Sequence, residues 1–130
     1  MAYQNIPDEL NQLSNKVIGL AIKVHKALGP GLLESSNKEC FFYEIVKTGY
    51  FAKKEKALPL VYEAVKLDIG YRIDILVETE LVIEVKSVEA LSDLQTAPVL
   101  TYLKLSGNRL GLLINFNVPL LKNGIKRLVL

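Results

Sequence analysis

Two charged triplets interrupt apolar runs in the middle of the chain, and they restrict its fold more than any other feature. Arg72-Ile73-Asp74 lies within Ile69–Val77, and Glu84-Val85-Lys86 closes the run that begins at Leu81. Both runs have the length and composition of buried strands. Because an unpartnered buried charge costs several kcal/mol, these side chains need water, one another or a ligand. If the carboxylates converge, the natural ligand is a hard divalent cation such as Mg²⁺.

The rest of the chain predicts helices on both sides of this strand pair. Helical spacing and terminal Pro and Gly residues predict a first helix over Asp8–Leu28 and a second over about Leu32–Lys47, capped by Gly49. The remaining expected elements are one or two strands in Phe51–Leu67, with Pro59 at an edge or bulge, strands at Ile69–Val77 and Leu81–Val85, a mostly helical Ser87–Ser106 interrupted by Pro98, a buried strand at Leu110–Phe116, and a tail, Val118–Leu130, that adds a last strand. The order ααβββαβ predicts an α/β or α+β fold.

Composition indicates a globular protein with no strong preference for a partner. Half of the 130 residues are hydrophobic and 23% are charged, so we expect residues 1–130 to form a single domain. The net charge of +2 is too small to predict nucleic-acid binding by itself. However, Asp93 is the last acidic residue, so the C-terminal part is basic. It suits an anionic partner or is an ordinary solvated face.

Single copies of cysteine and histidine exclude several classes of site. Cys40 cannot form an internal disulfide, which fits a reducing compartment, and with His25 it is the only candidate for a Cys–His pair. A zinc site built from several Cys and His ligands is excluded, and we expect Cys40 to be a packing residue. Met1–Pro7 has no signal-peptide pattern, and no apolar run reaches membrane-spanning length. We therefore expect a soluble, cytoplasmic protein without membrane partners.

The charged triplets form a candidate catalytic group if the two strands make a hairpin. Strand periodicity places Glu84 and Lys86 on one face, and a short turn would bring Asp74 beside them. Two carboxylates about 5 Å apart repel by roughly 3 kcal/mol at an effective dielectric near 20, so a metal or Lys86 must compensate. Mg²⁺ or Mn²⁺ with a lysine-positioned water suits phosphodiester hydrolysis. Alternatively, Arg72, Asp74, Glu84 and Lys86 are cross-strand ion pairs on a wet sheet face.

The sequence resembles a known family in several ordered blocks. It is similar to the small bacterial GxxExxR proteins, a branch of the PD-(D/E)XK nuclease-like superfamily. Together the matching blocks cover nearly everything after about Lys16. They are Ala27–Ser35 (ALGPGLLES), Gly70–Val77 (GYRIDILV), Val82–Val88 (VIEVKSV), Leu100–Lys104 (LTYLK) and Gly111–Phe116 (GLLINF).

The resemblance implies a fold and a set of roles. The expected fold is a restriction-endonuclease-like core, a mixed central sheet flanked by helices. Asp74 and Glu84 would be direct ligands of Mg²⁺ or Mn²⁺, and the Val85 carbonyl would supply a third oxygen. Lys86 would activate or position the attacking water. Glu34 matches the helical acid of the superfamily, which often contacts the metal through water. Read from its position alone, Glu34 is a first-turn acid that favours the helix dipole.

Some positions depart from the family pattern. The resemblance includes Tyr102 in the catalytic group. Relatives carry a Gln four residues before the corresponding tyrosine, but in this sequence that Gln position is occupied by Pro98. A position that is often His is Gln95, and Asn37 stands where the name motif expects Arg or a similar residue. Such losses around a metal site commonly cost about ten- to a hundredfold in affinity or activity.

Three functions are consistent with the sequence. The first is a Mg²⁺-dependent nuclease-like protein that hydrolyses DNA or RNA. The second is a nucleic-acid-binding or regulatory module on the same fold, which Pro98, Asn37 and the basic C-terminal part favour. The third is a structural protein in which the charged triplets only pair with each other. The apolar tail Leu120–Leu130 would suit a homodimer, since exposed apolar edges invite pairing.

Overall fold

The computed structural model describes residues 6–130. The expectation about a signal peptide concerns Met1–Pro7, most of which lies outside these residues. In chain order the elements are α1 (Asp8–Leu28), α2 (Glu34–Lys47), β1 (Ala52–Ala57), β2 (Leu60–Tyr62), β3 (Val65–Leu67), β4 (Arg72–Val77), β5 (Leu81–Lys86), α3 (Asp93–Ser106), β6 (Leu110–Asn115), a 3₁₀ turn η2 (Leu121–Gly124) and β7 (Ile125–Val129).

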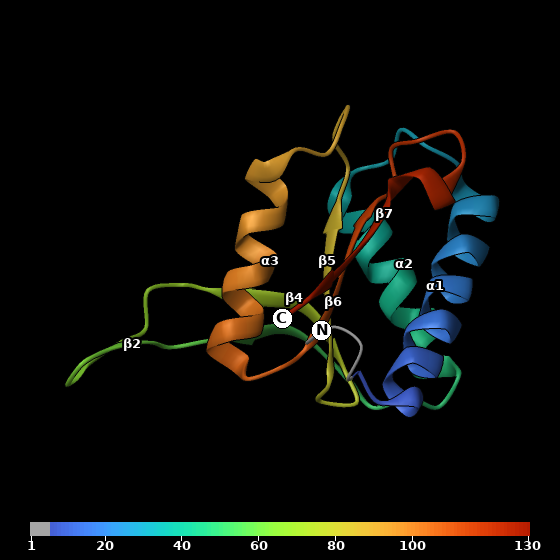
Figure 1. Cartoon of the computed structure of the whole chain (residues 1–130). Helices are drawn as coiled ribbons and strands as arrows, with labels where there is room; N and C mark the ends of the chain where they lie inside the picture. Colours follow the sequence, from blue (N-terminus) through green and yellow to red (C-terminus); the bar gives the residue numbers. More distant parts are fainter. Residues whose placement is uncertain (1–5) are drawn as a thin grey trace.

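A five-stranded mixed sheet in the order β1-β4-β5-β6-β7 forms the centre of the fold. Strands β5 and β6 are parallel and joined through α3, whereas the other neighbours are antiparallel. Helices α1 and α2 cover one face of the sheet and α3 covers the other (Figure 1). This arrangement confirms the predicted α/β architecture with a mixed sheet flanked by helices, and it is consistent with a restriction-endonuclease-like core.

Alternation along the strands divides the core into two apolar clusters. One cluster joins α1 and α2 to the sheet through residues such as Val17, Phe41 and Ile83. The smaller cluster lies under α3 and includes Val82 and Leu103. Because side chains alternate between faces along β5, the even-numbered positions of this strand point toward α3. The charged residues of β5 therefore belong to the α3 side of the sheet.

Both N-terminal helices were predicted well from local signals. Helix α1 spans Asp8–Leu28 as expected, and its chain direction changes at Gly29, whose φ is +71°. Helix α2 begins at Glu34 instead of Leu32, because Leu33 has an extended backbone at the N-cap. It ends at Lys47, and Gly49 follows with a φ of +104°, a conformation that glycine adopts without steric cost.

The segment between β1 and β4 differs most from the prediction. Strand β4 begins at Arg72, three residues later than expected, and Gly70 before it has a φ of +92°. Between Pro59 and Gly70 the chain forms the separate two-stranded sheet of β2 and β3, an arm that projects from the body of the molecule (Figure 1). Residues 61–70 are all exposed. This stretch thus carries two short strands that the order ααβββαβ did not include.

Helix α3 begins later than expected and continues through its proline. Residues 87–92 are not helical, and the helix starts after Ser92, whose side chain forms a capping box with Gln95. Pro98 lies inside α3 without ending it. Its position lacks only the backbone donor that would bond to the carbonyl of Leu94. After β6 the tail adds β7 at the sheet edge, which confirms the predicted last strand.

Candidate active site

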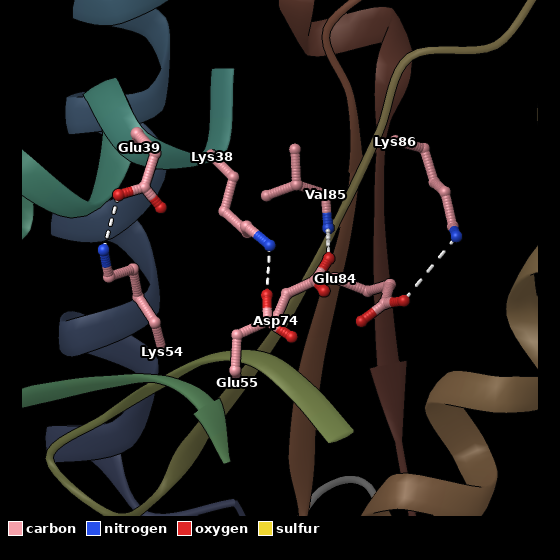
Figure 2. A network of polar contacts seen from close by, with 8 residues as sticks. All are labelled: Lys38, Glu39, Lys54, Glu55, Asp74, Glu84, Val85 and Lys86. Carbon is pink, nitrogen blue, oxygen red and sulfur yellow. Dashed lines mark hydrogen bonds and ion pairs between the residues drawn. The ribbon is translucent and has the colours of Figure 1, made fainter. Parts of the chain in front are cut away.

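The β4–β5 hairpin brings the two charged triplets together. The turn Glu78–Glu80 sets a register in which Ile75 pairs with Ile83. Asp74 and Glu84 are the residues immediately beyond this pair on the two adjacent strands. The regular strand ladder stops at this point, and the backbone N–H of Val85 donates instead to Oδ2 of Asp74 at 2.9 Å. Figure 2 shows Asp74, Glu84 and Lys86 around this junction.

Glu84 is a buried carboxylate with an incomplete set of partners. It is 6% exposed, and its Oε2 lies 3.6 Å from Nζ of Lys86. Its Oε1 is buried and has no hydrogen-bond partner among the described residues. Burial, and then the negative charge of Asp74, raises the pKa of Glu84 to about 8, although Lys86 opposes the shift. Without a further cation the site therefore favours a protonated Glu84.

Asp74 has a similar electrostatic environment with more compensation. Burial raises its pKa, the hydrogen bond from Val85 N–H lowers it, and the nearby Lys38 ammonium lowers it further. The carboxylate of Glu55 acts in the opposite direction. The net result is an Asp74 pKa above its ordinary value. Two adjacent carboxyl groups with raised pKa values are typical of a site that holds added positive charge.

Two ion pairs join α2 to β1, and one of them, Lys38–Glu55, lies beside the carboxylates (Figure 2). Lys38 of α2 contacts Oε1 of Glu55 in β1, and Lys54 of β1 contacts Oε1 of Glu39 in α2. Sequence reasoning missed both pairs. The charged run of residues 53–56 (KKEK) was the available signal, but nothing local indicates that α2 packs against this strand.

The predicted helical acid, Glu34, lies at the start of α2 and is exposed. Its Oε1 accepts a hydrogen bond from the backbone N–H of Ser87 at 3.3 Å, and the Ser87 hydroxyl donates to the carbonyl of Leu32. Glu34 thus contacts the residue that follows Lys86. Within residues 6–130, no group of three or more His, Cys, Asp or Glu side chains is close enough to hold a metal ion. The structure therefore groups Asp74 with Glu84 and leaves Glu34 outside that pair.

Residues of α3 complete the surroundings of the carboxylates. Tyr102 is partly buried, and its pKa is raised by burial and then by the charges of Glu84 and Asp74. Gln95, in contrast, accepts hydrogen bonds from the backbone N–H and hydroxyl of Ser92, so it caps the helix. Of the polar α3 positions considered in the sequence, Tyr102 is the one whose electrostatic environment includes the carboxylate pair.

The segment after β5 is held by a side chain that the sequence analysis did not select. Asn115, at the end of β6, is buried; its Oδ1 accepts from the N–H groups of Val88 and Asn117, and its Nδ2 donates to the Val88 carbonyl. These bonds fix the chain just beyond Lys86. A lone amide at the end of the apolar run Leu110–Phe116 was the signal that could have identified it.

The alternative Cys–His pair is not formed. Cys40 is exposed on α2, contrary to the expected packing role. His25 is buried, and its Nε2 lies 2.7 Å from the carbonyl oxygen of Val118. The expected motif position Asn37 is also buried, and its amide oxygen has no hydrogen-bond partner among the described residues.

The chemistry of the central pair fits a hard divalent cation. Asp74 and Glu84 supply carboxylate oxygens, the ligand type that Mg²⁺ and Mn²⁺ prefer. Oε1 of Glu84 has lone pairs available that no donor in residues 6–130 satisfies. An added cation would stabilise the ionised form of Glu84 and so offset the effect of burial, which raises its pKa. The residues present therefore fit a metal, with two protein carboxylates as its anchor.

The mixed sheet thus carries a carboxylate pair on two adjacent strands, with a lysine two residues beyond one of them. The model of one family, described as the PD-(D/E)XK nuclease superfamily, matches residues 11–128. The chain belongs to the PD-(D/E)XK nuclease superfamily, whose nucleases typically use divalent metals and act on nucleic acids. Searches of curated proteins and of solved structures gave no match. In residues 6–130, no helix is long and apolar enough to cross a membrane.

Proposed function

We propose that this protein is a Mg²⁺- or Mn²⁺-dependent phosphodiesterase of the GxxExxR branch that hydrolyses DNA or RNA. The observation that supports it most is Glu84, a buried carboxylate with an oxygen that has no partner among the described residues and a pKa raised to about 8. A buried structural ion pair is favourable only where hydrogen bonds satisfy the remaining lone pairs. Here Lys86 reaches only Oε2, at 3.6 Å.

Each side chain of the proposed site has a distinct task. Asp74 and Glu84 would hold the metal, and the Val85 carbonyl, on the same strand as Glu84, would supply a further oxygen. The bound metal would lower the pKa of a coordinated water and stabilise charge on the phosphate. Lys86, on the same face as Glu84, would position an attacking water for in-line displacement. The N–H of Val85 keeps Asp74 in a fixed orientation through its 2.9 Å hydrogen bond.

Two further residues have supporting roles in this proposal. Tyr102 is on α3, from where its hydroxyl would hydrogen-bond to a phosphate oxygen and its ring would reduce the access of solvent to the site. Glu34 would act through a water, because its carboxylate already accepts a hydrogen bond from the backbone N–H of Ser87. Glu84 must release its proton before it can hold the metal, and the positive charge of Lys86 favours that release.

The primary test is thermal unfolding of the wild type and of an Asp74→Ala/Glu84→Ala variant, each with and without millimolar Mg²⁺ or Mn²⁺. Binding to the native state raises its stability by mass action. We expect a metal-dependent rise in the wild type that disappears in the double variant. Incubation with DNA and RNA then tests catalysis, with Lys86→Ala as the matched inactive variant. Cleavage equal in the wild type and Lys86→Ala would contradict the proposal.

A second candidate is a nucleic-acid-binding module that has lost catalysis. Pro98 favours it, since proline provides no side-chain amide where relatives carry Gln, and the described residues include no third metal-capable side chain beside Asp74 and Glu84. This candidate predicts salt-sensitive binding of DNA or RNA that Asp74→Ala leaves unchanged. Absence of binding at low salt would contradict it.

A further inference from the structure

Two neighbouring side chains of opposite sign, the cationic Lys38 and the anionic Glu55, act on Asp74 from outside the proposed metal site. Glu55 stands where the β1–β4 register is interrupted, between the pairs Lys54–Ile75 and Lys56–Ile73, and its backbone φ is +53°. Its negative charge raises the pKa of Asp74, so the two carboxylates repel each other. The ammonium group of Lys38 reaches across from α2 to Glu55 and lies beside Asp74 (Figure 2).

Lys38 differs from the other lysine that joins α2 and β1. Its side chain is 19% exposed, against 34% for Lys54. The hydrogen bond to Glu55 raises the pKa of Lys38 most, burial opposes this, and the charge of Asp74 raises it again. Lys54 pairs instead with Glu39, whereas the partner of Lys38, Glu55, is one of the charges that act on Asp74. The same two elements therefore carry one ion pair at the site and one away from it.

We propose that Lys38 is a positioning residue that acts as the internal counter-cation of Asp74 and competes electrostatically with a divalent ion for that carboxylate. The inference rests on the proposed metal site, and it adds a regulator of metal affinity that is not itself a ligand. In the absence of metal, Lys38 offsets the repulsion between Glu55 and Asp74. When a divalent ion binds, the same ammonium repels it, which weakens binding.

The consequence is opposite for folding and for metal binding. Removing the Lys38 charge leaves the Val85 N–H and the weaker effect of Lys86 to offset the negative charge of Glu55 at Asp74, so the metal-free protein loses stability. The same change removes a positive charge next to an incoming divalent ion, so metal affinity increases. A unit charge and a double charge about 6 Å apart interact strongly enough, even in water, to change an equilibrium constant by about tenfold at low ionic strength.

The test is isothermal titration of Mn²⁺ into folded protein at low ionic strength, comparing wild type, Lys38→Gln and the matched variant Lys54→Gln. Glutamine keeps a donor for the carboxylate partner while removing the charge. We expect Lys38→Gln to lower the Kd for Mn²⁺ by about fivefold or more, and Lys54→Gln to change it by less than about twofold. Circular dichroism verifies that each variant is folded before titration.

A double variant separates this role from a purely structural link between α2 and β1. If Lys38 acts on Asp74, the Lys38→Gln effect on the Kd persists in a Glu55→Gln background. If Lys38 acts only by holding Glu55, the effect disappears there, which overturns the inference. Should Lys38→Gln fail to fold, Lys38→Met in the Glu55→Gln background provides the same comparison.

The outcomes distinguish this inference from the proposed function. Mn²⁺ binding by the wild type with an unchanged Kd in Lys38→Gln overturns the role of Lys38 and leaves the metal site supported. No Mn²⁺ binding by any of the proteins overturns both. Binding that is measurable only after the Lys38 charge is removed supports the inference directly.

Discussion

Replacing Glu84 by glutamine should change the pH dependence of stability more than stability itself. The folded-state pKa of Glu84 is about 8, above its ordinary value of 4.5. The folded protein therefore holds this proton more tightly than the unfolded chain does. By linkage, the stability of the metal-free wild type falls as pH rises from about 4.5 to about 8. Glu84→Gln has no proton to lose and removes this contribution.

The size of the effect follows from the shift. Each pKa unit corresponds to 1.36 kcal/mol, so ionised Glu84 destabilises the fold by a few kcal/mol at pH 8.5, and on the order of 5 kcal/mol at most. The amide brings an N–H donor into the place of the unpartnered Oε1, which costs about 1–3 kcal/mol at every pH. We therefore expect Glu84→Gln to be less stable than wild type at pH 5 and more stable by about 2 kcal/mol at pH 8.5.

Urea unfolding of metal-free protein at a series of pH values measures this difference. Glu80→Gln is the matched control, because Glu80 is an exposed glutamate in the same hairpin. We expect the control to follow the wild type at every pH. A difference in unfolding free energy between Glu84→Gln and wild type that stays constant from pH 5 to pH 8.5 would refute the reasoning. It would mean that Lys86 or solvent already compensates an ionised Glu84.

Three further substitutions test features that position the site. Gly124→Ala should destabilise the fold by about 3 kcal/mol or more in urea unfolding, because its Cβ would lie 2.3 Å from the carbonyl oxygen of Asn115. Asn115→Ala should cost about 2–3 kcal/mol and speed amide hydrogen exchange at Val88, which loses its hydrogen-bond acceptor; unchanged exchange would contradict this. Pro98→Ala should raise the free energy of unfolding by about 1–2 kcal/mol, since it restores a backbone N–H for the Leu94 carbonyl. An unchanged unfolding midpoint would mean that α3 is already relaxed around the proline.

Local sequence signals predicted α1 and the hairpin that carries Asp74 and Glu84. The bounds of α1 follow from apolar spacing over Asp8–Leu28, and the β4–β5 hairpin follows from two apolar runs around Glu78–Glu80. Both depend on interactions between residues near each other in the chain. The approach of Asp74 to Glu84 could therefore be predicted, because a hairpin register relates residues across a short turn.

The errors in the sequence prediction arose where local preference gave way to context. The apolar alternation of residues 69–71 predicted strand, but the positive φ of Gly70 and the exposed arm before it separate this segment from β4. Pro98 predicted a helix break, although α3 continues because the capping box at Ser92 and the apolar face around Leu103 stabilise it. Local propensity is a weak guide when packing provides more free energy.

The sequence by itself determined the carboxylate pair and its lysine, because strand periodicity and a short turn place them without reference to distant segments; the mixed sheet was expected only from the family resemblance, since its parallel β5–β6 pairing joins residues 29 positions apart. The tertiary structure alone decided what surrounds them. It places Lys38 and Glu55 beside Asp74, brings Glu34 within hydrogen-bond distance of the backbone of Ser87, and leaves one oxygen of Glu84 buried without a partner among residues 6–130. These contacts join α2 to β1, the next element along the chain, and to the end of β5, 53 residues away from Glu34, and they form only when the helix packs on the sheet.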